Sequence, residues 1–253
     1  MRLRFDSDRE QAELAKYLGD RFELERLWLY EHQLAAEFAA AEDEQSFYRT
    51  SVAYLYNLTA FAMTGTKLPY LRELIRRVPP GARVLDYGCG IGSDGLILLE
   101  AGYDVAFADF DNPSTAYLRW RLRQRGLDAP VHDLDVGVPG GFDAAFAFDV
   151  IEHVSDPFAL LAALEQRAGL VEVNFLEPIP GDQATHHRLP VDALVRHAAA
   201  RRLHFYRVLH RRSHLVIYEP REAGRFDLLL NRGRLLVAGL GARYFSRWAS
   251  SMP

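Results

Sequence analysis

The sequence predicts an α/β fold: a seven-stranded sheet of five parallel strands and a C-terminal antiparallel hairpin, preceded by an N-terminal helical cap. Residues 8–78 place apolar side chains three to four residues apart, as amphipathic helices do. From residue 83 onward, short apolar runs alternate with helix-like stretches, which is typical of parallel β-α-β units. The last two runs are joined only by residues 210–212, and so short a link permits only an antiparallel pair.

The expected elements follow in order. Pro79-Pro80-Gly81 ends the helical cap, because prolines and glycine interrupt helices. Strands are expected at 83–87, 104–109, 130–133, 143–149 and 169–175, with helices between them at 93–101, 113–126 and 155–167. A helix at about 190–201 precedes the hairpin strands 203–209 and 213–218. We therefore divide the chain into a cap (1–80), a core (81–220) and a C-terminal extension (221–253).

Composition narrows the functional classes. The 253 residues are 49% hydrophobic, enough to bury a full core. The net charge of -4 disfavours a nucleic-acid partner, which usually requires a basic face. Cys89 is the only cysteine, so no internal disulfide forms and a reducing, cytoplasmic location is expected. Residues 1–6 lack the apolar core of a signal peptide and no apolar run approaches about 20 residues, so neither a signal peptide nor a transmembrane segment is expected.

The clearest functional motif follows the first expected strand, at Asp86-Tyr87-Gly88-Cys89-Gly90-Ile91-Gly92. Glycines allow a tight turn and the close approach of a ligand, and the next helix points its N-terminus at that ligand. Asp86 would repel a pyrophosphate but suits a cationic ligand such as an ammonium or sulfonium group. Gly90 to Gly95 also fits the dinucleotide pattern G-x-G-x-x-G, so an NAD(P)-binding oxidoreductase is an alternative.

The second and third expected strands each end in an aspartate, Asp109 and Asp133 respectively. Asp109 lies 21 residues after Gly88, which is one helix plus one strand, so its carboxylate can accept hydrogen bonds from ribose hydroxyls. Phe110 can pack against an adenine. Asp111 could share the ribose role, but we prefer to place it in the N-cap region of the helix that starts at Pro113.

The acidic residue, the glycine loop and the closing hairpin together resemble the class I S-adenosylmethionine-dependent methyltransferases, over about residues 80 to 220. The resemblance implies a Rossmann-like sheet, S-adenosylmethionine as methyl donor and S-adenosylhomocysteine as product. It also implies that Asp86, Gly88, Gly90 and Gly92 hold the donor. By family position Asp133 contacts the adenine amino group and Leu134 adds backbone contacts, with Asp135 as the second choice.

The segment after the fourth strand looks like the family's post-strand-4 segment. Asp149 would face the methyl donor, and Glu152-His153 opens the next element. Ligands of open α/β sheets bind at the carboxyl ends of the strands, so Asp149 and His153 should face the reaction. His153 is the leading catalytic candidate, because a histidine near neutral pKa can take the proton of a hydroxyl acceptor. His187, in a loop at the same edge, would border the acceptor.

A metal-dependent alternative uses the same region. Asp149, Glu152, His153 and His187 resemble the ligand set of small-RNA 2′-O-methyltransferases, and mixed nitrogen and oxygen ligands suit a divalent ion that polarises a hydroxyl. The first acid is Asp in place of Glu, and the chain has no obvious RNA-binding face. We therefore favour a metal-free role for His187, beside the substrate as in ubiquinone-type and other small-molecule O-methyltransferases.

The sequence features that concern the methyl acceptor and the partners are less specific. Tyr48 and Tyr54 lie in an aromatic cap segment that suits a lid over an acceptor, although core packing is equally compatible. Residues 226–248 resemble a basic amphipathic helix. We expect it to pack on the domain or on a second copy in a homodimer, and in second place on a membrane surface. Gly239 and Gly241 weaken it as one continuous helix.

The sequence therefore predicts methyl transfer to a hydroxyl of a small molecule, such as a sugar, a polyketide or another metabolite. The alternatives are a metal-dependent 2′-O-methyltransferase acting on a sugar or RNA, an N- or C-methyltransferase, the nicotinamide enzyme, and a non-catalytic cofactor-binding module.

Overall fold

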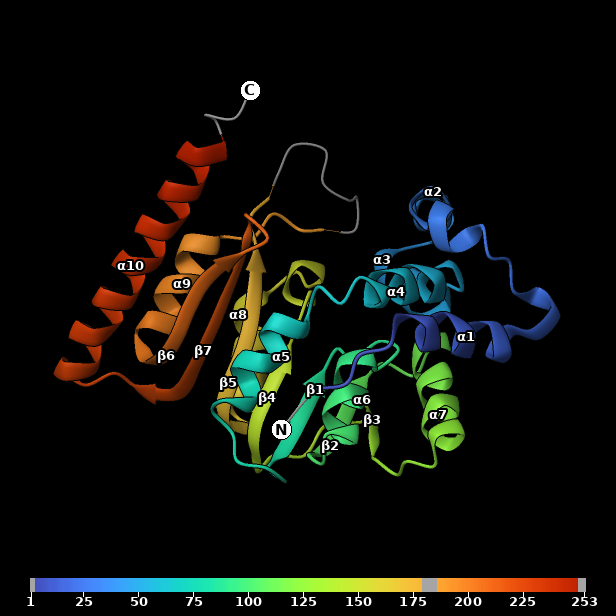
Figure 1. Cartoon of the computed structure of the whole chain (residues 1–253), viewed down its shortest axis with the longest axis horizontal. Helices are drawn as coiled ribbons and strands as arrows, with labels where there is room; N and C mark the ends of the chain where they lie inside the picture. The colour runs from blue at the N-terminus through green and yellow to red at the C-terminus, as the bar shows by residue number, and fades with distance from the viewer. Residues whose placement is uncertain (1–2, 179–185, 250–253) are drawn as a thin grey trace. The chain divides into compact units, whose positions relative to one another are not determined.

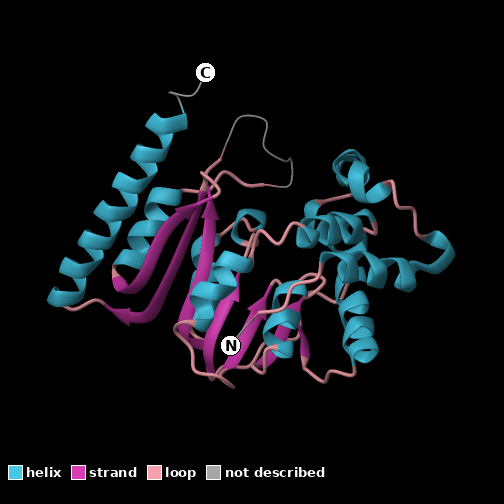
Figure 2. Cartoon of the chain, in the orientation of Figure 1, coloured by secondary structure: helices cyan, strands magenta, loops and turns pink. Residues whose placement is uncertain are grey.

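The computed structural model describes residues 3–178 and 186–249. The expected N-terminal helical region is present as five α-helices (Figures 1 and 2). They are α1 (Ser7–Leu18), α2 (Arg26–Ala40), α3 (Glu44–Thr50), α4 (Ala53–Met63) and α5 (Leu68–Ile75). A short 3-10 turn, Gly19–Arg21, follows α1, because Gly19 adopts a positive φ of 57° and ends that helix. Helix α4 packs against α1 and α2.

The seven-stranded sheet confirms the predicted fold (Figure 2). Its strands are β1 (Arg83–Tyr87), β2 (Asp104–Asp109), β3 (Val131–Asp133), β4 (Phe142–Ala147), β5 (Ala168–Leu176), β6 (Arg201–Leu209) and β7 (Ser213–Glu222). The strand order is β3-β2-β1-β4-β5-β7-β6. Strand β1 pairs parallel with β2 and β2 with β3, whereas β7 runs antiparallel to both β5 and β6. In the hairpin, His210 and Arg211 have positive φ values of 49° and 70°, as tight hairpin turns require.

The later helices differ from the expectations at their ends. They are α6 (Ser93–Glu100), α7 (Pro113–Arg125), α8 (Pro157–Glu165), α9 (Val191–Ala199) and α10 (Arg225–Ala249). Helix α8 begins later than expected because the Asp156 carboxylate accepts the backbone N–H groups of Phe158 and Ala159, both at 3.0 Å. At α7 the cap is Asn112, in a capping box with Thr115.

Two further features differ from the expectations. Strand β4 ends at Ala147, so Asp149 lies beyond the strand. Helix α10 is continuous through Gly239 and Gly241, although these glycines were expected to weaken it as one helix. Its packing against β6 offsets the weak helix propensity of glycine, which costs only about 1 kcal/mol per residue.

The described chain divides into two compact units. Residues 3–143 form the first unit, and residues 144–178 with 186–249 form the second. In the first unit a buried cluster joins the helical region to the following α/β part, through Leu14, Leu27, Leu55, Tyr56, Ile91 and Tyr117. Among residues 3–178 and 186–249, no helix combines the length and the apolar character needed to cross a membrane.

Candidate functional site

The glycine loop follows β1 at its carboxyl end. Gly88, Gly90 and Gly92 all have positive φ values, between 52° and 73°, a region that side chains with a Cβ rarely adopt. The N–H of Gly88 donates to the Ala108 carbonyl of β2 at 2.8 Å. A Cβ on Gly92 would lie 2.4 Å from a methyl carbon of Leu118. The loop is therefore held against β2 and α7 in a conformation that requires glycine.

Asp86 lies near the end of β1, next to the glycine loop. Its side chain is buried, and its Oδ2 accepts the backbone N–H of Gly95 in the first turn of α6 at 3.0 Å. Burial, together with the charges of Asp94 and Asp109, raises the pKa of Asp86 well above its usual value. This carboxyl group fixes the helix that follows the loop, and a contact of Asp86 with a cationic ligand stays a prediction.

Asp109 lies where the sequence placed it, at the carboxyl end of β2. Its Oδ2 accepts the N–H of Gly90 and its Oδ1 accepts the N–H of Phe110, each at 2.7 Å. Each carboxylate oxygen can accept a second hydrogen bond. Burial raises the pKa of Asp109 to about 6, although the two N–H donors oppose the shift. The glycine loop and the acid thus form one polar site within the first unit.

Arg49, on α3, also contacts residues of this polar site. The sequence analysis did not identify it. Its guanidinium lies 4.8 Å from the centre of the Phe110 ring and binds both carboxylate oxygens of Asp135, at 2.6 and 2.9 Å. The Leu134 N–H donates to the Asp109 carbonyl at 3.0 Å, and Asp133 Oδ1 accepts the Asp135 N–H at 3.0 Å. No local motif marks Arg49, because its partners lie more than sixty residues away in the sequence.

Tyr48 and Tyr54 border an aromatic cluster in the cap. Their ring centres are 5.6 Å apart, and both rings pack edge-on against buried Phe47. The side-chain amide of Asn112 donates to the Tyr48 carbonyl at 3.2 Å. This anchors α3 to the N-cap of α7. A contact of the two tyrosines with an acceptor stays a prediction.

In the second unit, Asp149 follows β4 in a left-handed conformation, with φ 52°. Its N–H donates to Asn174 Oδ1 at 2.9 Å, and the Asn174 amide donates back to Asp149 Oδ1 at 2.6 Å and to Ser213 Oγ at 3.1 Å. Strained residues of this kind persist where their surroundings fix them, and they cluster at functional sites. Asn174 was missed as a site residue, although a polar side chain inside the apolar run 169–175 is a usable signal.

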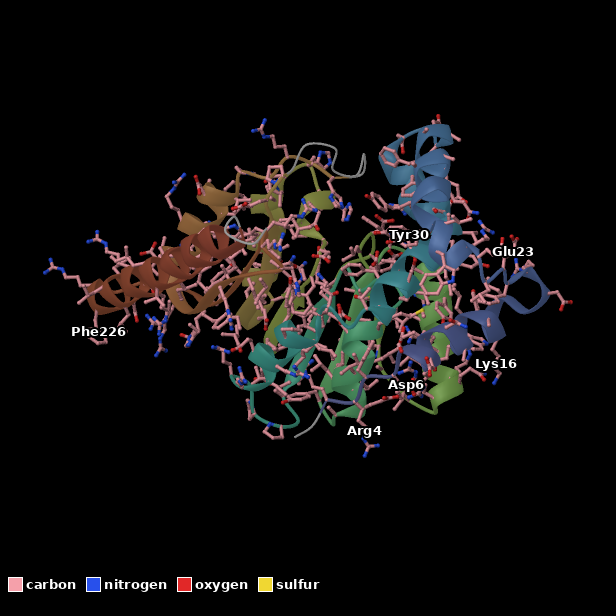
Figure 3. The ribbon with its side chains drawn as sticks, turned by 45° about the horizontal axis from the view of Figure 1, so that its top comes forward. Arg4, Asp6, Lys16, Glu23, Tyr30 and Phe226 are labelled. Atoms are coloured by element: carbon pink, nitrogen blue, oxygen red, sulfur yellow. The ribbon has the colours of Figure 1, made fainter. Side chains whose placement is uncertain are left out.

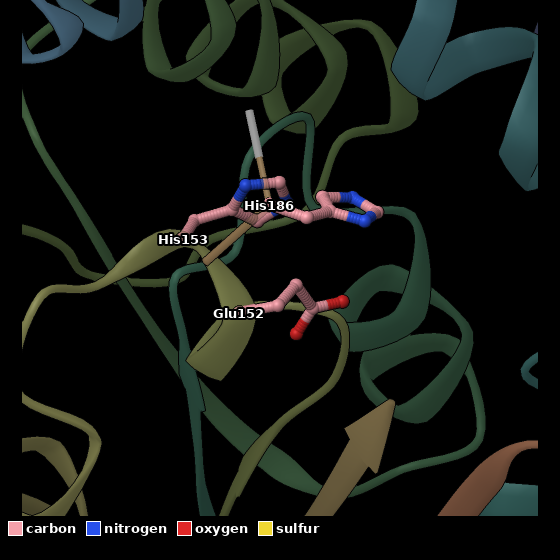
Figure 4. A group of neighbouring side chains, drawn as sticks. All are labelled: Glu152, His153 and His186. Atoms are coloured by element: carbon pink, nitrogen blue, oxygen red, sulfur yellow. The ribbon is translucent and has the colours of Figure 1, made fainter. Parts of the chain in front are cut away.

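Glu152 and His153, which follow β4, come together with His186, which follows β5 (Figure 4). Their ligand atoms all lie within 4.8 Å of one another, the carboxylate is buried, and the two imidazole rings meet edge to face at 4.9 Å between centres. His187 was expected in this group. Instead its backbone N–H donates to the Glu152 carbonyl at 2.7 Å, and its neighbour His186 supplies the ring. Asp149 is also outside the group.

Comparison with known proteins identifies the family. A family model described as a methyltransferase domain matches residues 63–221, more than half of the chain. A ubiquinone biosynthesis O-methyltransferase of Xanthomonas campestris pv. campestris (strain B100) is 32% identical over 107 residues, which are 40% of this chain and 44% of that protein. The match thus spans less than half the length of that relative.

Two solved structures have similar folds. Magnesium protoporphyrin IX methyltransferase from Synechocystis, with bound SAM, covers 87% of this chain and 99% of its own at a TM-score of 0.51 and 15% identity. The PH0226 protein from Pyrococcus horikoshii OT3 covers 69% of this chain and 95% of its own, at a TM-score of 0.52 and 16% identity. At these identities the likeness concerns the fold. The chain therefore belongs to the methyltransferase domain family and has the fold of the class I S-adenosylmethionine-dependent methyltransferases.

Proposed function

We propose that this chain transfers the methyl group of S-adenosylmethionine to a hydroxyl oxygen of a small molecule, with S-adenosylhomocysteine as the second product. One observation carries the choice of donor: the Asp109 carboxylate accepts the N–H of Gly90 in the glycine loop, at 2.7 Å. An acid that can bind a ribose and a loop that can approach the rest of the ligand thereby share one site. Relatives that are named O-methyltransferases support an oxygen acceptor.

The residues present fit the donor. The Cβ of an alanine at Gly90 would lie 2.9 Å from a methyl carbon of Leu58 on α4, so it would displace that side chain as well as strain a backbone with φ 52°. Asp109 keeps acceptor capacity for two ribose hydroxyls, and the aromatic ring of Phe110 and the carboxylate of Asp133 are the proposed adenine contacts. When bound, S-adenosylmethionine supplies a methyl group on a cationic sulfur that an oxygen nucleophile attacks in line.

His153 is the proposed general base. Its neutral imidazole accepts the acceptor's hydroxyl proton while the oxygen forms its bond to the methyl carbon, and the electrons of the broken carbon–sulfur bond stay on sulfur. The buried Glu152 carboxylate, within 4.8 Å of the histidine nitrogens, stabilises the imidazolium that results. His187 and the cap tyrosines Tyr48 and Tyr54 are proposed to border the acceptor, and Asp149 to face the donor.

Calorimetric titration with S-adenosylmethionine and S-adenosylhomocysteine tests the donor site. Binding of a nicotinamide cofactor in their place would contradict the proposal. For the base, His153→Ala should lower kcat by about a hundredfold or more and leave the affinity for S-adenosylhomocysteine within twofold. The matched control is His204→Ala, which removes an imidazole paired with Glu219 on the β6–β7 hairpin and should leave kcat unchanged.

The outcome also separates the other acceptor classes. An N- or C-methyltransferase needs no strong base, so an unchanged kcat in His153→Ala would favour one of these. A non-catalytic module would bind the donor and yield no S-adenosylhomocysteine with any acceptor pool. Mass spectrometry of the product distinguishes these results.

A second candidate, metal-dependent transfer to a sugar or RNA hydroxyl, is favoured by the Glu152, His153 and His186 group. Two imidazole nitrogens and a carboxylate oxygen within 4.8 Å are a ligand set that suits zinc or a similar divalent ion. In this metal-dependent mechanism His153 and His186 are both metal ligands. Alanine at either position should lower both metal content, measured by elemental analysis, and turnover. Turnover that a chelator does not affect would remove this candidate.

A further inference from the structure

Helix α10 turns polar side chains toward its own domain. Asn231 is buried, and its side-chain amide donates to the carbonyls of Ala199 and Arg201, at 2.9 and 2.8 Å. One turn earlier, Asp227 forms an ion pair with Arg221 of β7 at 3.1 Å. The helix is thus attached to the β6–β7 hairpin and α9 through hydrogen bonds and charge, where a surface helix usually packs an apolar face.

In the part of α10 whose side chains are described, the large apolar side chains are exposed, except for the half-buried Leu235. Phe226 and Val237 are each 71% exposed, Leu236 is 67% and Leu229 is 66% exposed. Figure 3 shows Phe226 at the start of the helix. The spacing of these four residues places them on one stripe of an α-helix. Single exposed apolar residues are normal, but a continuous exposed stripe marks an interaction surface. We name these four residues the apolar stripe.

The charge beside the apolar stripe is basic. Residues 225–249 contain five arginines and one acid, Asp227, and this acid is engaged by Arg221. Arg225 and Arg232 are seven residues apart, so they lie on the same side of the helix, along one edge of the stripe. Among the described side chains, the outward face therefore combines apolar groups with positive charge and has no carboxylate.

We infer that α10 binds to the surface of a membrane that contains anionic phospholipids, with the apolar stripe at the acyl-chain boundary and Arg225 and Arg232 at the headgroups. An apolar face bordered by arginine is the pattern of helices that lie in the membrane interface, and anionic headgroups attract basic segments. A second copy fits less well. A two-fold interface would set the same arginine-lined patch against itself, and like charges across an interface disfavour association.

Vesicle sedimentation of the full chain tests this surface. Vesicles of equal parts phosphatidylglycerol and phosphatidylcholine should bind the protein at low salt, and pure phosphatidylcholine vesicles should bind it much less. The double variant Leu229→Asp, Leu236→Asp should lower binding about a hundredfold or more, because each leucine buried in lipid contributes a factor of about ten. Arg232→Glu should weaken binding to the anionic vesicles and reduce its dependence on salt.

The matched control is Leu228→Asp, the same substitution on the same helix but one residue, or about 100° of rotation, away from Leu229. It should bind vesicles like the original protein, and circular dichroism melting should show that all variants remain folded. Absence of binding to anionic vesicles, or equal binding by the double variant, overturns the inference. Light scattering that finds a dimer which the double variant dissociates, without vesicle binding, assigns the stripe to a second copy and also overturns it.

Discussion

Arg121 of α7 holds the N-terminal helix and the glycine loop together, and its removal gives the sharpest stability prediction. Its fully buried guanidinium pairs with Glu10 and Glu13 of α1, at 2.5 and 2.8 Å. The same group donates to the Ile91 carbonyl at 2.9 Å and to Ser93 Oγ at 2.8 Å. One cation thus satisfies two carboxylates and two loop oxygens at once.

Arg121→Leu removes the guanidinium from these four acceptors, and among the described residues Glu10 keeps only the Ser93 hydroxyl as a close donor, at 2.7 Å. Arg125 still binds Glu13 at 2.7 Å but lies 3.6 Å from Glu10, so Glu10 becomes the poorly compensated buried charge. Breaking a buried ion pair by removing one partner costs about 3–5 kcal/mol, a large part of the roughly 5–15 kcal/mol that stabilises a typical domain. We expect a loss of this size in the free energy of unfolding, measured by urea denaturation. We also expect weaker binding of S-adenosylhomocysteine.

The control is Arg119→Leu on the same helix. Arg119 pairs with Asp111 at 2.8 Å, but both side chains are exposed, so the expected loss is below about 1 kcal/mol. Adding Glu10→Gln to Arg121→Leu should recover part of the stability, because it removes the uncompensated charge. Equal losses in Arg121→Leu and Arg119→Leu, or no recovery in the double variant, would refute the reasoning.

Three further predictions concern the two sites. The pKa of Asp109 is about 6 in the free protein, and its ionised form accepts the ribose hydroxyls, so calorimetry should find that the affinity for S-adenosylhomocysteine rises about tenfold from pH 5 to pH 7. The Asp109→Asn variant should bind S-adenosylhomocysteine weakly and without that pH dependence. A flat pH profile in the original protein would contradict the assignment. Gly92→Ala, whose Cβ would lie 2.4 Å from a leucine methyl, should lower the melting temperature by more than Gly126→Ala, where φ is also positive but no atom lies within 4 Å of the new Cβ. Asn174→Ala removes both hydrogen bonds that fix Asp149 and should lower the free energy of unfolding by about 1–3 kcal/mol. Turnover, measured under conditions in which the variant is folded, should also fall. Unchanged turnover would show that the strained loop at Asp149 has no catalytic role.

The sequence by itself determined the order and type of the strands, the closing hairpin and the place of Asp109. These features depend on residues that are close together in the chain. Apolar periodicity defines each element, and the short 210–212 link forces an antiparallel pair. The spacing of one helix plus one strand after the glycine loop places Asp109 at the end of the second strand.

Only the tertiary structure decided which side chains those elements bring together. The buried contact of Asp86 with Gly95, the pairing of Asn174 with Asp149 and the choice of His186 over His187 all depend on residues packed from distant segments or on the direction in which a loop side chain points. For α10, the periodicity indicated an amphipathic helix, but the packing on β6 decided which face is buried. The physical reason is that a buried amide requires hydrogen-bond partners, and the carbonyls of Ala199 and Arg201 that accept from Asn231 are brought to it by packing of segments about thirty residues away in the sequence.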